Sequence, residues 1–246
     1  MQLRGKRAVV TGAGSGFGAG IARAFATAGA QVVVADIDSA AAAVVAAEIG
    51  GLAQATDVAS GDQVMALAEA SVAALGGVDI LVNNAGITHL PAPMEAVSEA
   101  DFDRVFAVNC KSVYLTARAF VPAMKVAGAG AILNIASTAG VSPRPRLNWY
   151  NASKGWMITA TKAMAVELAP AGIRVNALNP VAGETPLLKS FMGEDTPEMR
   201  AKFLATIPMG RFSTPQDLAA AALFLCSDEA SLITGVGLEI DGGRCI

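Results

Sequence analysis

A tyrosine, a lysine and a serine are spaced in a way that suits proton transfer. Tyr150 and Lys154 lie four positions apart, and Ser137 lies thirteen residues before the tyrosine. Residues four apart share a face of a helix, so the Lys154 ammonium is expected to approach the Tyr150 phenol. A free tyrosine has a pKa of about 10, and a neighbouring positive charge lowers that value by about 1–3 units. A phenol tuned in this way exchanges a proton with an alcohol or carbonyl oxygen, which the Ser137 hydroxyl would hold. The spacing alone is common, so the surrounding elements must support this interpretation.

The composition indicates a substantial buried core and no membrane span. Of the 246 residues, 53% are hydrophobic and 16% are charged. The apolar residues come in short runs, and none reaches the roughly eighteen residues that would indicate a membrane helix. Met1–Arg7 leads directly into an apolar, strand-like segment, which leaves no room for a signal peptide. The length fits one large domain or two small ones.

Charge and side-chain chemistry argue against several classes of function. The net charge is −3 with no dense basic patch, which argues against nucleic acid as a main partner. The three cysteines, Cys110, Cys226 and Cys245, are far apart and odd in number, as is typical of thiols in a reducing cytoplasm. The single histidine, His89, rules out a multi-histidine metal site, and no other cluster has ligand spacing. We expect a cytoplasmic protein without a metal.

Apolar, β-branched runs alternate with Ala-rich helical stretches along the chain. The expected strands are Arg7–Thr11, Gln31–Ala35, Leu52–Thr56, Val78–Val82, Ala131–Ala136, Ile173–Leu178 and Val236–Ile240. The expected helices are Gly16–Ala28, Ser39–Ile49, Ser60–Leu75, Ala100–Val126, Trp149–Leu168 and Pro215–Cys226. Alternation of this kind predicts βαβ units and a parallel sheet covered on both faces. Such a sheet binds ligands at the carboxyl ends of its strands.

One long segment, Ala182–Phe212, is irregular and rich in glycine and proline. Within a compact domain such a segment is more often a lid or binding loop than a plain connection. We expect it to cover the substrate. The alternative is a surface excursion with a short helix around Pro197–Thr206.

A glycine-rich turn, Thr11–Gly18, follows the first expected strand and opens the first helix. Its glycines permit a tight turn and let backbone N–H groups approach a phosphate at the positive end of the helix. The second strand ends at Asp36, whose carboxylate can bind an adenine-ribose diol and would repel a 2′-phosphate. Neither Ser15 nor Ile37 offers a positive charge, so the pattern favours NAD(H) over NADP(H). Asp38 is expected to cap the next helix.

These motifs together resemble the short-chain dehydrogenase/reductase family. The resemblance rests on the glycine turn, on Asn83–Gly86 after the fourth strand, and on Ser137, Tyr150 and Lys154. It covers essentially the whole chain. It implies an α/β fold with a Rossmann-type, doubly wound parallel sheet of about seven strands in a single domain spanning residues 1–246, with a substrate-covering loop at about 182–212. It also implies a homotetramer, in which the C-terminal run Leu238–Ile246 takes part.

The resemblance further implies roles for individual residues. Tyr150 is similar to the catalytic acid/base, and Lys154 to the residue that lowers its pKa and binds the nicotinamide ribose. Ser137 would orient the substrate oxygen, and Asn109 would support Lys154 through a water-linked proton path. The alternative for Asn109 is a polar side chain that bonds to nearby backbone and bends its helix. The implied NAD-binding residues are Gly12, Ser15, Gly16, Phe17, Gly18, Asp36, Ile37, Asp57, Val58, Asn84, Ala85, Gly86, Tyr150, Lys154, Pro180, Val181 and Thr185. For Asn83 and its neighbours the competing role is stabilisation of the sheet.

The chain departs from the family pattern after the sixth strand. The family usually has Pro-Gly there, whereas this chain has Pro180 and Val181, and Thr185 keeps the spacing of a nicotinamide-carboxamide contact. Valine disfavours positive φ, so the backbone at Val181 is expected to stay in an ordinary region. The side chain would pack against the nicotinamide or narrow the substrate entrance.

The substrate is less well defined by the sequence. Arg144 and Arg146 lie between Ser137 and Tyr150, where they would either attract an anionic substrate group or be solvated or contact another subunit; we favour the second reading. An apolar pocket could be lined by His89, Leu90, Trp149, Leu187, Leu188 and Phe191. We expect His89 to be a surface or hydrogen-bonded residue, and Trp149 could equally be a core or interface anchor.

The sequence therefore predicts an oxidoreductase that transfers a hydride between NAD(H) and a small secondary alcohol or ketone, with polyols and hydroxy acids included. One alternative is a 3-oxoacyl-thioester (acyl carrier protein) reductase, against which Asp36 weighs because such enzymes usually use NADPH. A minor alternative is a non-catalytic nucleotide-binding protein, which the complete set of four catalytic residues argues against.

Overall fold

The computed structural model describes residues 1–246 and contains one parallel sheet of seven strands in the order β3-β2-β1-β4-β5-β6-β7. The strands are β1 (Arg7–Thr11), β2 (Gln31–Asp36), β3 (Leu52–Ala55), β4 (Ile80–Asn83), β5 (Gly130–Ile135), β6 (Ile173–Pro180) and β7 (Gly237–Ile240). Starting from β1, the chain adds β2 and β3 on one side and β4 to β7 on the other side, so the order of addition reverses between β1 and β4. A crevice for ligands forms at such a point, outside the carboxyl ends of the strands.

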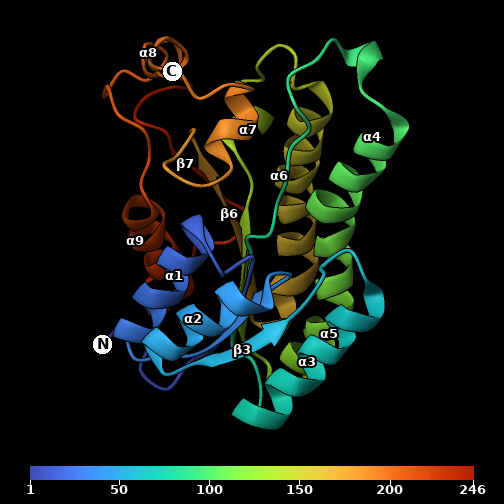
Figure 1. Ribbon diagram of the computed structural model, residues 1–246. Helices are drawn as coiled ribbons and strands as arrows, with labels where there is room; N and C mark the ends of the chain where they lie inside the picture. The colour runs from blue at the N-terminus through green and yellow to red at the C-terminus, as the bar shows by residue number, and fades with distance from the viewer.

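Helices cover both faces of the sheet, as Figure 1 shows. They are α1 (Gly16–Thr27), α2 (Ser39–Ile49), α3 (Gly61–Leu75), α4 (Glu99–Phe106), α5 (Ser112–Ala127), α6 (Asn148–Leu168), α7 (Leu188–Met192), α8 (Pro197–Leu204) and α9 (Pro215–Cys226). Side chains of a strand alternate between faces. Accordingly Ala8 and Val10 of β1 pack with α1, α2 and α9, whereas Val9 packs with α3, α5 and α6. Burial on both faces explains why the strands are continuous apolar runs.

Side-chain caps set the starts of several helices. The Asp38 carboxylate accepts from the N–H groups of Ala40 and Ala41, each at 3.0 Å, which confirms the predicted cap of α2. Thr214 and Asp217 form a reciprocal capping box at the start of α9. These contacts satisfy N–H groups that have no partner within the helix.

The helix predicted over Ala100–Val126 is interrupted in the structure. The chain forms α4, then a π-helical turn at Ala107–Lys111, then α5. A π-helical turn inserts an extra residue into the helix and often occurs at functional sites. Asn109 lies on this turn, so the helix is not regular where the asparagine is placed.

The segment Ala182–Phe212 contains α7 and α8 and packs on a small core of its own. The predicted short helix around Pro197–Thr206 is present as α8. The core consists of Val181, Leu188, Met192, Ile207 and Phe212, all of them buried. Figure 1 shows both helices at the top of the molecule, beside the C-terminus.

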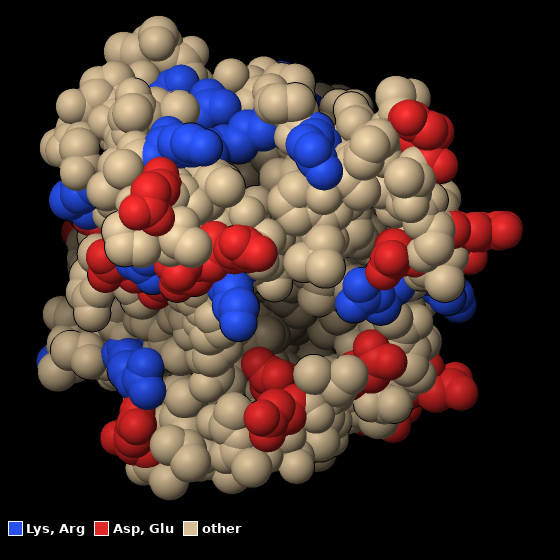
Figure 2. All heavy atoms as spheres, turned by 45° about the horizontal axis from the view of Figure 1, so that its top comes forward, with Lys and Arg blue, Asp and Glu red and all other residues tan.

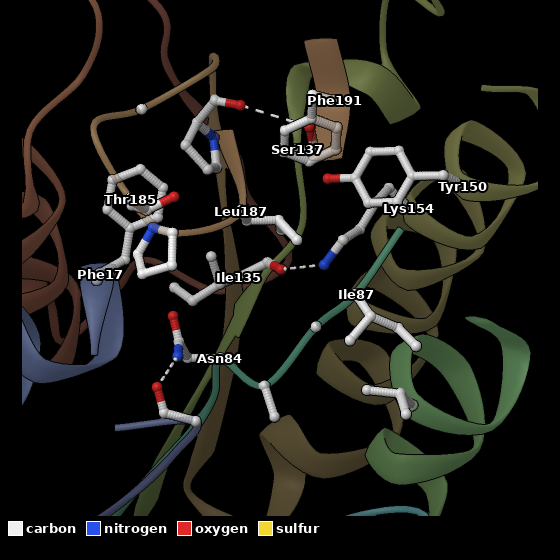
Figure 3. A pocket seen from close by; sticks show the side chains of 18 of the residues that line it. Phe17, Asn84, Ile87, Ile135, Ser137, Tyr150, Lys154, Thr185, Leu187 and Phe191 are labelled. Atoms are coloured by element: carbon white, nitrogen blue, oxygen red, sulfur yellow. Dashed lines mark hydrogen bonds between the residues drawn. The ribbon is translucent and has the colours of Figure 1, made fainter. Parts of the chain in front are cut away.

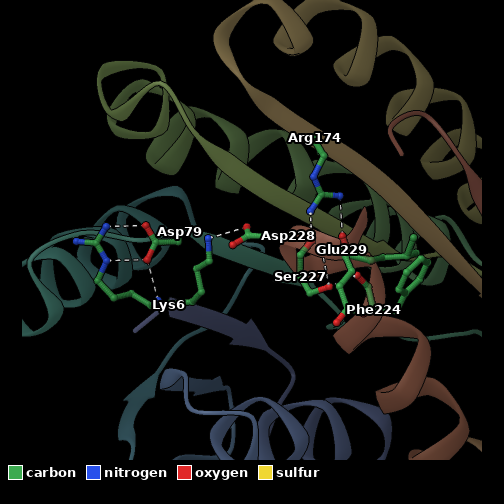
Figure 4. Close-up of polar contacts among 9 residues, drawn as sticks. Lys6, Asp79, Arg174, Phe224, Ser227, Asp228 and Glu229 are labelled. Carbon is green, nitrogen blue, oxygen red and sulfur yellow. Dashed lines mark hydrogen bonds and ion pairs between the residues drawn. The ribbon is translucent and has the colours of Figure 1, made fainter. Parts of the chain in front are cut away.

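Charged side chains join the amino ends of the strands, as Figure 4 shows. The Arg7 guanidinium donates to both oxygens of Asp79, at 2.8 and 2.6 Å, and Lys6 pairs with Asp228 at 2.8 Å. Arg174 donates to the backbone carbonyls of Leu225, Ser227 and Ile233. At this edge of the sheet, each of these charged side chains is paired with an opposite charge or with backbone carbonyls. None of the helices combines the length and apolarity required to cross a membrane.

Candidate active site

A cavity of about 460 Å³ opens at the carboxyl ends of the strands, on the face that Figure 2 shows hollowed, and most of the predicted site residues line it. These are Gly12, Ser15, Gly16, Phe17, Asp36, Ile37, Asp57, Val58, Asn84, Ala85, Gly86, Ser137, Tyr150, Lys154, Pro180, Val181 and Thr185. Gly18 and Asn109 lie behind this lining rather than in it. One cavity thus brings together all the residues assigned to the cofactor except Gly18, and three of the four assigned to proton transfer.

The glycine turn is packed so closely that side chains could not replace its hydrogens. A Cβ at Gly18 would lie within 2.2 Å of the Gly12 carbonyl oxygen, and one at Gly12, whose φ is +60°, within 2.7 Å of the Ala85 Cα. The Asn84 amide donates to the carbonyls of Thr11 and Gly12, both at 2.9 Å. Asn84 thereby fastens the turn to the end of β4 (Figure 3).

The start of α1 has the features of a site for a pyrophosphate. Ser15 occupies the cap position, but its side chain makes no capping hydrogen bond. The first N–H groups of a helix have no partner within the helix, and Ser15, Gly16 and Phe17 line the cavity. Donors at the positive end of a helix dipole bind phosphate. The turn therefore fits the diphosphate of a dinucleotide.

Asp36 lies where a ribose would be recognised. Its carboxylate accepts from the N–H of Gly14 at 2.8 Å and from the N–H of Asp38 at 3.0 Å. The only Lys and Arg side chains that line the cavity are Arg144 and Lys154, on α6 or just before it. No cation thus lies beside Asp36 to hold a 2′-phosphate, so the donor and acceptor set fits NAD better than NADP.

Asn83 points away from the cavity and into the sheet. Its amide donates to Asn134 at 2.9 Å and accepts from Thr116 at 2.9 Å, and Asn134 donates in turn to Thr161 at 2.8 Å. All four side chains are buried. This network matches the sheet-stabilising reading of Asn83, since buried polar groups are costly unless they are paired.

Tyr150 is buried, and its hydroxyl is directed into the cavity near Ser137 (Figure 3). Its ring packs edge-on against Phe191, with centroids 5.0 Å apart. The Ser137 hydroxyl accepts from the N–H of Ala139 at 3.0 Å, which orients it at the end of β5. The two hydroxyls come from different elements and share one end of the cavity.

The pKa of Tyr150 differs from the sequence expectation. Burial raises it to about 12, and a hydrogen bond with Ser137 and the positive charge of Arg144 oppose that rise only in part. The expected lowering by Lys154 is absent because the ammonium does not reach the phenol oxygen. Its Nζ donates to the Ile135 carbonyl at 2.8 Å and lies 6.0 Å from the centre of the tyrosine ring. Desolvation of the phenolate therefore outweighs the nearby charges.

Lys154 is itself a buried cation without a carboxylate partner. Burial lowers its pKa to about 8, because an ammonium that has lost its water is less stable than the neutral amine. A Cβ at Gly86 would lie 3.3 Å from its Nζ, so the glycine leaves room for the ammonium. Only a small residue at this position permits a lysine to extend to the cavity floor.

Asn109 is fully buried and bonds to the strand-end segment rather than to its own helix. Its Oδ1 accepts from the N–H of Ile87, and its Nδ2 donates to the Ile87 carbonyl and to the Ser153 hydroxyl, all at 2.9 Å. These partners differ from the predicted alternative, in which the side chain would bond to the backbone of its own helix. No hydrogen bond joins Asn109 to Lys154 directly.

Val181 keeps an ordinary backbone conformation, since Arg146 is the only residue other than glycine with positive φ. The side chain is buried in the core of the segment Ala182–Phe212 and also lines the cavity. Thr185 lines the cavity close to Gly16, whose Cβ would lie 3.2 Å from the threonine side chain. The valine thus joins the segment Ala182–Phe212 to the end of β6, a role that the sequence did not reveal.

Of the six residues suggested for an apolar pocket, four do not line the cavity, namely His89, Leu90, Trp149 and Leu188. The expectation of a hydrogen-bonded His89 is confirmed. His89 is buried, with Nδ1 at 2.8 Å from the Leu90 carbonyl, and neither residue lines the cavity. Trp149 packs edge-on against Phe102 and donates to the Met94 carbonyl, and Leu188 lies in the small core. Leu187, Phe191 and Arg144 do line the cavity, whereas Arg146 is exposed outside it.

Several further residues line the cavity, although the sequence did not single them out. They are Thr56, Ile87, Val108, Ile135, Ala136, Thr138, Ala139, Leu147, Ala182, Gly183, Pro186 and Phe203. Most lie next to a recognised motif, and adjacency to a strand end was the available signal. Phe203 comes from α8, and no local pattern marks it as facing the cavity.

Comparison with known proteins gives consistent results. Residues 12–244 match the family described as Enoyl-(Acyl carrier protein) reductase. The chain is similar to the 4-formylbenzenesulfonate dehydrogenase of Comamonas testosteroni, with 50% identity over all of both chains.

Two solved structures are similar to this chain in both sequence and fold. The 3-ketoacyl-(acyl-carrier-protein) reductase of Brucella melitensis, complexed with NADH, shares 55% identity and a TM-score of 0.95 over 99% of this chain and 100% of its own. A 7α-hydroxysteroid dehydrogenase complexed with NADH and 7-oxo glycochenodeoxycholic acid shares 41% identity and a TM-score of 0.93 over 98% and 95%. Both structures hold NADH.

Proposed function

Because the chain belongs to the short-chain dehydrogenase/reductase family, we propose that Tyr150 exchanges a proton with the oxygen of an alcohol or carbonyl substrate. The enzyme is an NAD-dependent oxidoreductase of small molecules. The observation that carries the residue assignment is the cavity itself. It holds the buried Tyr150 and Ser137 at one end and the glycine cradle with Asp36 at the other.

We assign the cofactor residues as follows. The glycine turn and the start of α1 would hold the diphosphate, and Asp36 would bind the adenine ribose. Asp57 and Val58 would contact the adenine, and Asn84–Gly86 would form the floor beneath the adenosine ribose. Lys154 and Thr185, with Pro180 and Val181, would hold the nicotinamide half. When bound, NAD(H) accepts or donates the hydride, which no side chain of this chain can supply.

The side chains then account for the proton. On reduction, the carbonyl carbon gains a hydride, its π bond breaks toward oxygen, and that oxygen takes the proton of the Tyr150 hydroxyl. Ser137 donates a hydrogen bond to the same oxygen and holds it in place. Because the pKa of Tyr150 is raised to about 12, the tyrosine carries this proton at neutral pH. The oxidation direction requires the phenolate and is favoured by higher pH.

Lys154 and Asn109 do not exchange the substrate proton themselves, but they support Tyr150 in this step. Because Lys154 does not lower the pKa of Tyr150 in this structure, we propose that its ammonium acts mainly by holding the nicotinamide ribose next to the tyrosine. Asn109 is a positioning residue, since its amide fixes Ile87 and Ser153. We propose that it also supports the return of the proton toward Lys154.

The proposed substrate is a small alcohol or the corresponding carbonyl compound. Secondary alcohols, polyols and hydroxy acids are included. The Comamonas relative is named for a substrate with a formyl group and a sulfonate on one benzene ring, so we add aromatic carbonyl compounds.

Reduction of a 3-oxoacyl thioester is the second candidate. It is favoured by the similarity to a reductase of that name from Brucella. Because that structure holds NADH, the preference of Asp36 for NAD does not argue against this activity. A non-catalytic role is disfavoured because all four predicted catalytic residues are present.

We further propose that residues 1–246 form a single dinucleotide-binding domain whose segment 182–212 covers the substrate. A homotetramer is our proposal from the family, and light scattering tests it. The free thiols of Cys110, Cys226 and Cys245 support a reducing, cytoplasmic location.

Two measurements test the assignment. Fluorescence titration should give tighter binding of NADH than of NADPH, and the reverse order would show that Asp36 does not select the cofactor. Tyr150→Phe should lower kcat roughly 10²- to 10⁴-fold with the Kd for NADH unchanged. Full turnover in that variant would remove Tyr150 from the mechanism.

A further inference from the structure

Charges of opposite sign occupy different parts of the cavity. Its two acidic side chains, Asp36 and Asp57, end β2 and follow β3. Its two basic ones, Arg144 and Lys154, come from the segment after β5 and from α6. The strand order places β2 and β3 on the opposite side of the β1–β4 crevice from β5. The half of the cavity that holds Tyr150 is therefore positively charged.

Arg144 has no counter-ion in this half. Five arginines of the chain form salt bridges, and none of those five lines the cavity: Arg7, Arg23, Arg104, Arg200 and Arg211. Arg144 stacks on Phe203, 4.3 Å from the ring centre, and its only side-chain hydrogen bond is a 3.3 Å contact with Thr206. A guanidinium has five N–H donors, so most of its donors are free.

A second cation, Arg244, lies near Arg144 and also lacks a carboxylate partner. Burial together with the nearby positive charge of Arg244 lowers the pKa of Arg144 to about 10. Arg244 is bound to Ser142 through its terminal nitrogens, and its Nε is buried without a partner. Two half-buried cations without a carboxylate are unfavourable by themselves. An anion between the cavity and these groups would be stabilised by both.

The surroundings of Arg144 indicate what kind of anion would fit. Leu147, Leu187, Phe191 and Phe203 line the same part of the cavity, and the Tyr150 phenol is close enough for Arg144 to influence its pKa. A planar guanidinium binds carboxylate and sulfonate groups through paired hydrogen bonds. A short apolar body, such as a benzene ring, suits the aromatic and aliphatic walls between these two groups.

We propose that Arg144 is a specificity residue that binds a sulfonate or carboxylate group of the substrate while the reacting oxygen of that substrate lies at Tyr150. The proposal rests on the function assigned above and names its substrate class, an organic acid with an apolar body. It assigns the anion-binding role to Arg144 alone, because Arg146 is exposed and outside the cavity.

The test compares three para-substituted benzaldehydes as substrates for reduction with NADH. 4-Formylbenzenesulfonate and 4-formylbenzoate carry the anion, and 4-formylbenzenesulfonamide is a neutral compound of similar shape. Charge-assisted hydrogen bonds of this kind correspond to a preference of roughly 10- to 100-fold. We expect wild-type kcat/KM to favour both anions over the sulfonamide by that factor.

Variants at the two arginines separate the anion site from general damage. Arg144→Gln should lower kcat/KM for the two anions at least tenfold more than kcat/KM for the sulfonamide, and Arg144→Lys should keep part of the preference. Arg146→Gln, which removes the same charge two residues away, should behave as wild type. Equal losses for all three aldehydes in Arg144→Gln, with no rescue by Arg144→Lys, would overturn the proposal.

A binding measurement makes the outcome independent of turnover. Calorimetric titration of the NAD-loaded enzyme with 4-methylbenzenesulfonate, which has no reducible group, should give a Kd at least tenfold weaker in Arg144→Gln. Equal affinity for the two proteins would overturn the proposal. Turnover of the sulfonamide without preference for the anions leaves the oxidoreductase assignment intact and overturns only the role of Arg144. Loss of turnover with retained, Arg144-dependent binding contradicts the assigned reaction instead.

Discussion

Charged side chains are paired at one edge of the sheet, at the amino ends of the strands, and unpaired at the other edge, at the carboxyl ends. At the amino ends of the strands, Arg7 meets Asp79, Lys6 meets Asp228, and Arg174 is surrounded by carbonyl oxygens. At the carboxyl ends, Arg144 and Lys154 have no carboxylate partner. Both edges belong to the same strands. The difference therefore reflects what each edge does rather than how the sheet forms.

The paired edge, at the amino ends of the strands, stabilises the fold. The unpaired edge, at the carboxyl ends, destabilises the fold, but its cations are available to ligands. A buried ammonium without a counter-ion is unfavourable, and the pKa of Lys154, lowered to about 8, is a measure of that cost. Unpaired charges in a cavity are the groups that can interact with a charged or polar ligand. Three predictions test this comparison.

The largest effect is expected from Lys154→Met. The variant should lose roughly 10²- to 10⁴-fold in kcat because the proposed lysine contact that orients the nicotinamide ribose beside Tyr150 is removed. At pH 7 it should nevertheless be more stable than wild type, by about 1–3 kcal/mol, since the desolvated charge is removed. Steady-state kinetics and denaturant titration measure the two effects. Lys162→Met, an exposed position on the same helix, should change neither.

The stability gain in Lys154→Met should depend on pH. Between about pH 8 and pH 10.5 the unfolded wild-type chain keeps the Lys154 proton while the folded chain has lost it, so this group makes wild-type stability rise with pH. The variant lacks that contribution, and its advantage should shrink by pH 9.5. An advantage that is constant from pH 7 to 9.5 would contradict the lowered pKa.

A smaller effect is expected from Asp79→Asn at the paired edge. This substitution should lower stability and leave turnover unchanged. The Arg7 guanidinium would lose its carboxylate, which should cost about 1–3 kcal/mol of unfolding free energy and leave kcat unchanged. Hydrogen bonding from Arg7 lowers the pKa of Asp79, so the contribution is present above about pH 4, the ordinary aspartate value. It is lost as the pH falls through the lowered pKa. Denaturant titration at pH 7 and pH 3 would show whether the difference between wild type and variant closes in acid.

The smallest effect is expected from Lys6→Ala. The Lys6–Asp228 pair is largely solvent-exposed on the aspartate side, and exposed pairs contribute about 0–1 kcal/mol. The loss should fall further in 1 M salt, which screens exposed charges. A loss as large as that of Asp79→Asn would show that the paired edge acts as one network rather than as separate contacts.

The sequence was most informative where structure is local. The i, i+4 placement of Tyr150 and Lys154, the glycine turn and the cap at Asp38 depend on short stretches of backbone, and each lies where the residue pattern indicated. The interrupted helix at Asn109 was missed because a π-helical turn has no distinctive composition. Phe203 was missed because its contact with the cavity depends on how α8 folds back.

The amino-acid sequence by itself determined the order of helices and strands along the chain, the glycine turn and the candidate side chains for proton transfer, since these follow from periodicity and residue type. Only the tertiary structure decided that burial raises the pKa of Tyr150 and lowers that of Lys154. It also decided that Arg144 lines the cavity while Arg146 does not. Desolvation and electrostatic pairing depend on segments that are distant in sequence, and no local pattern encodes which of them meet.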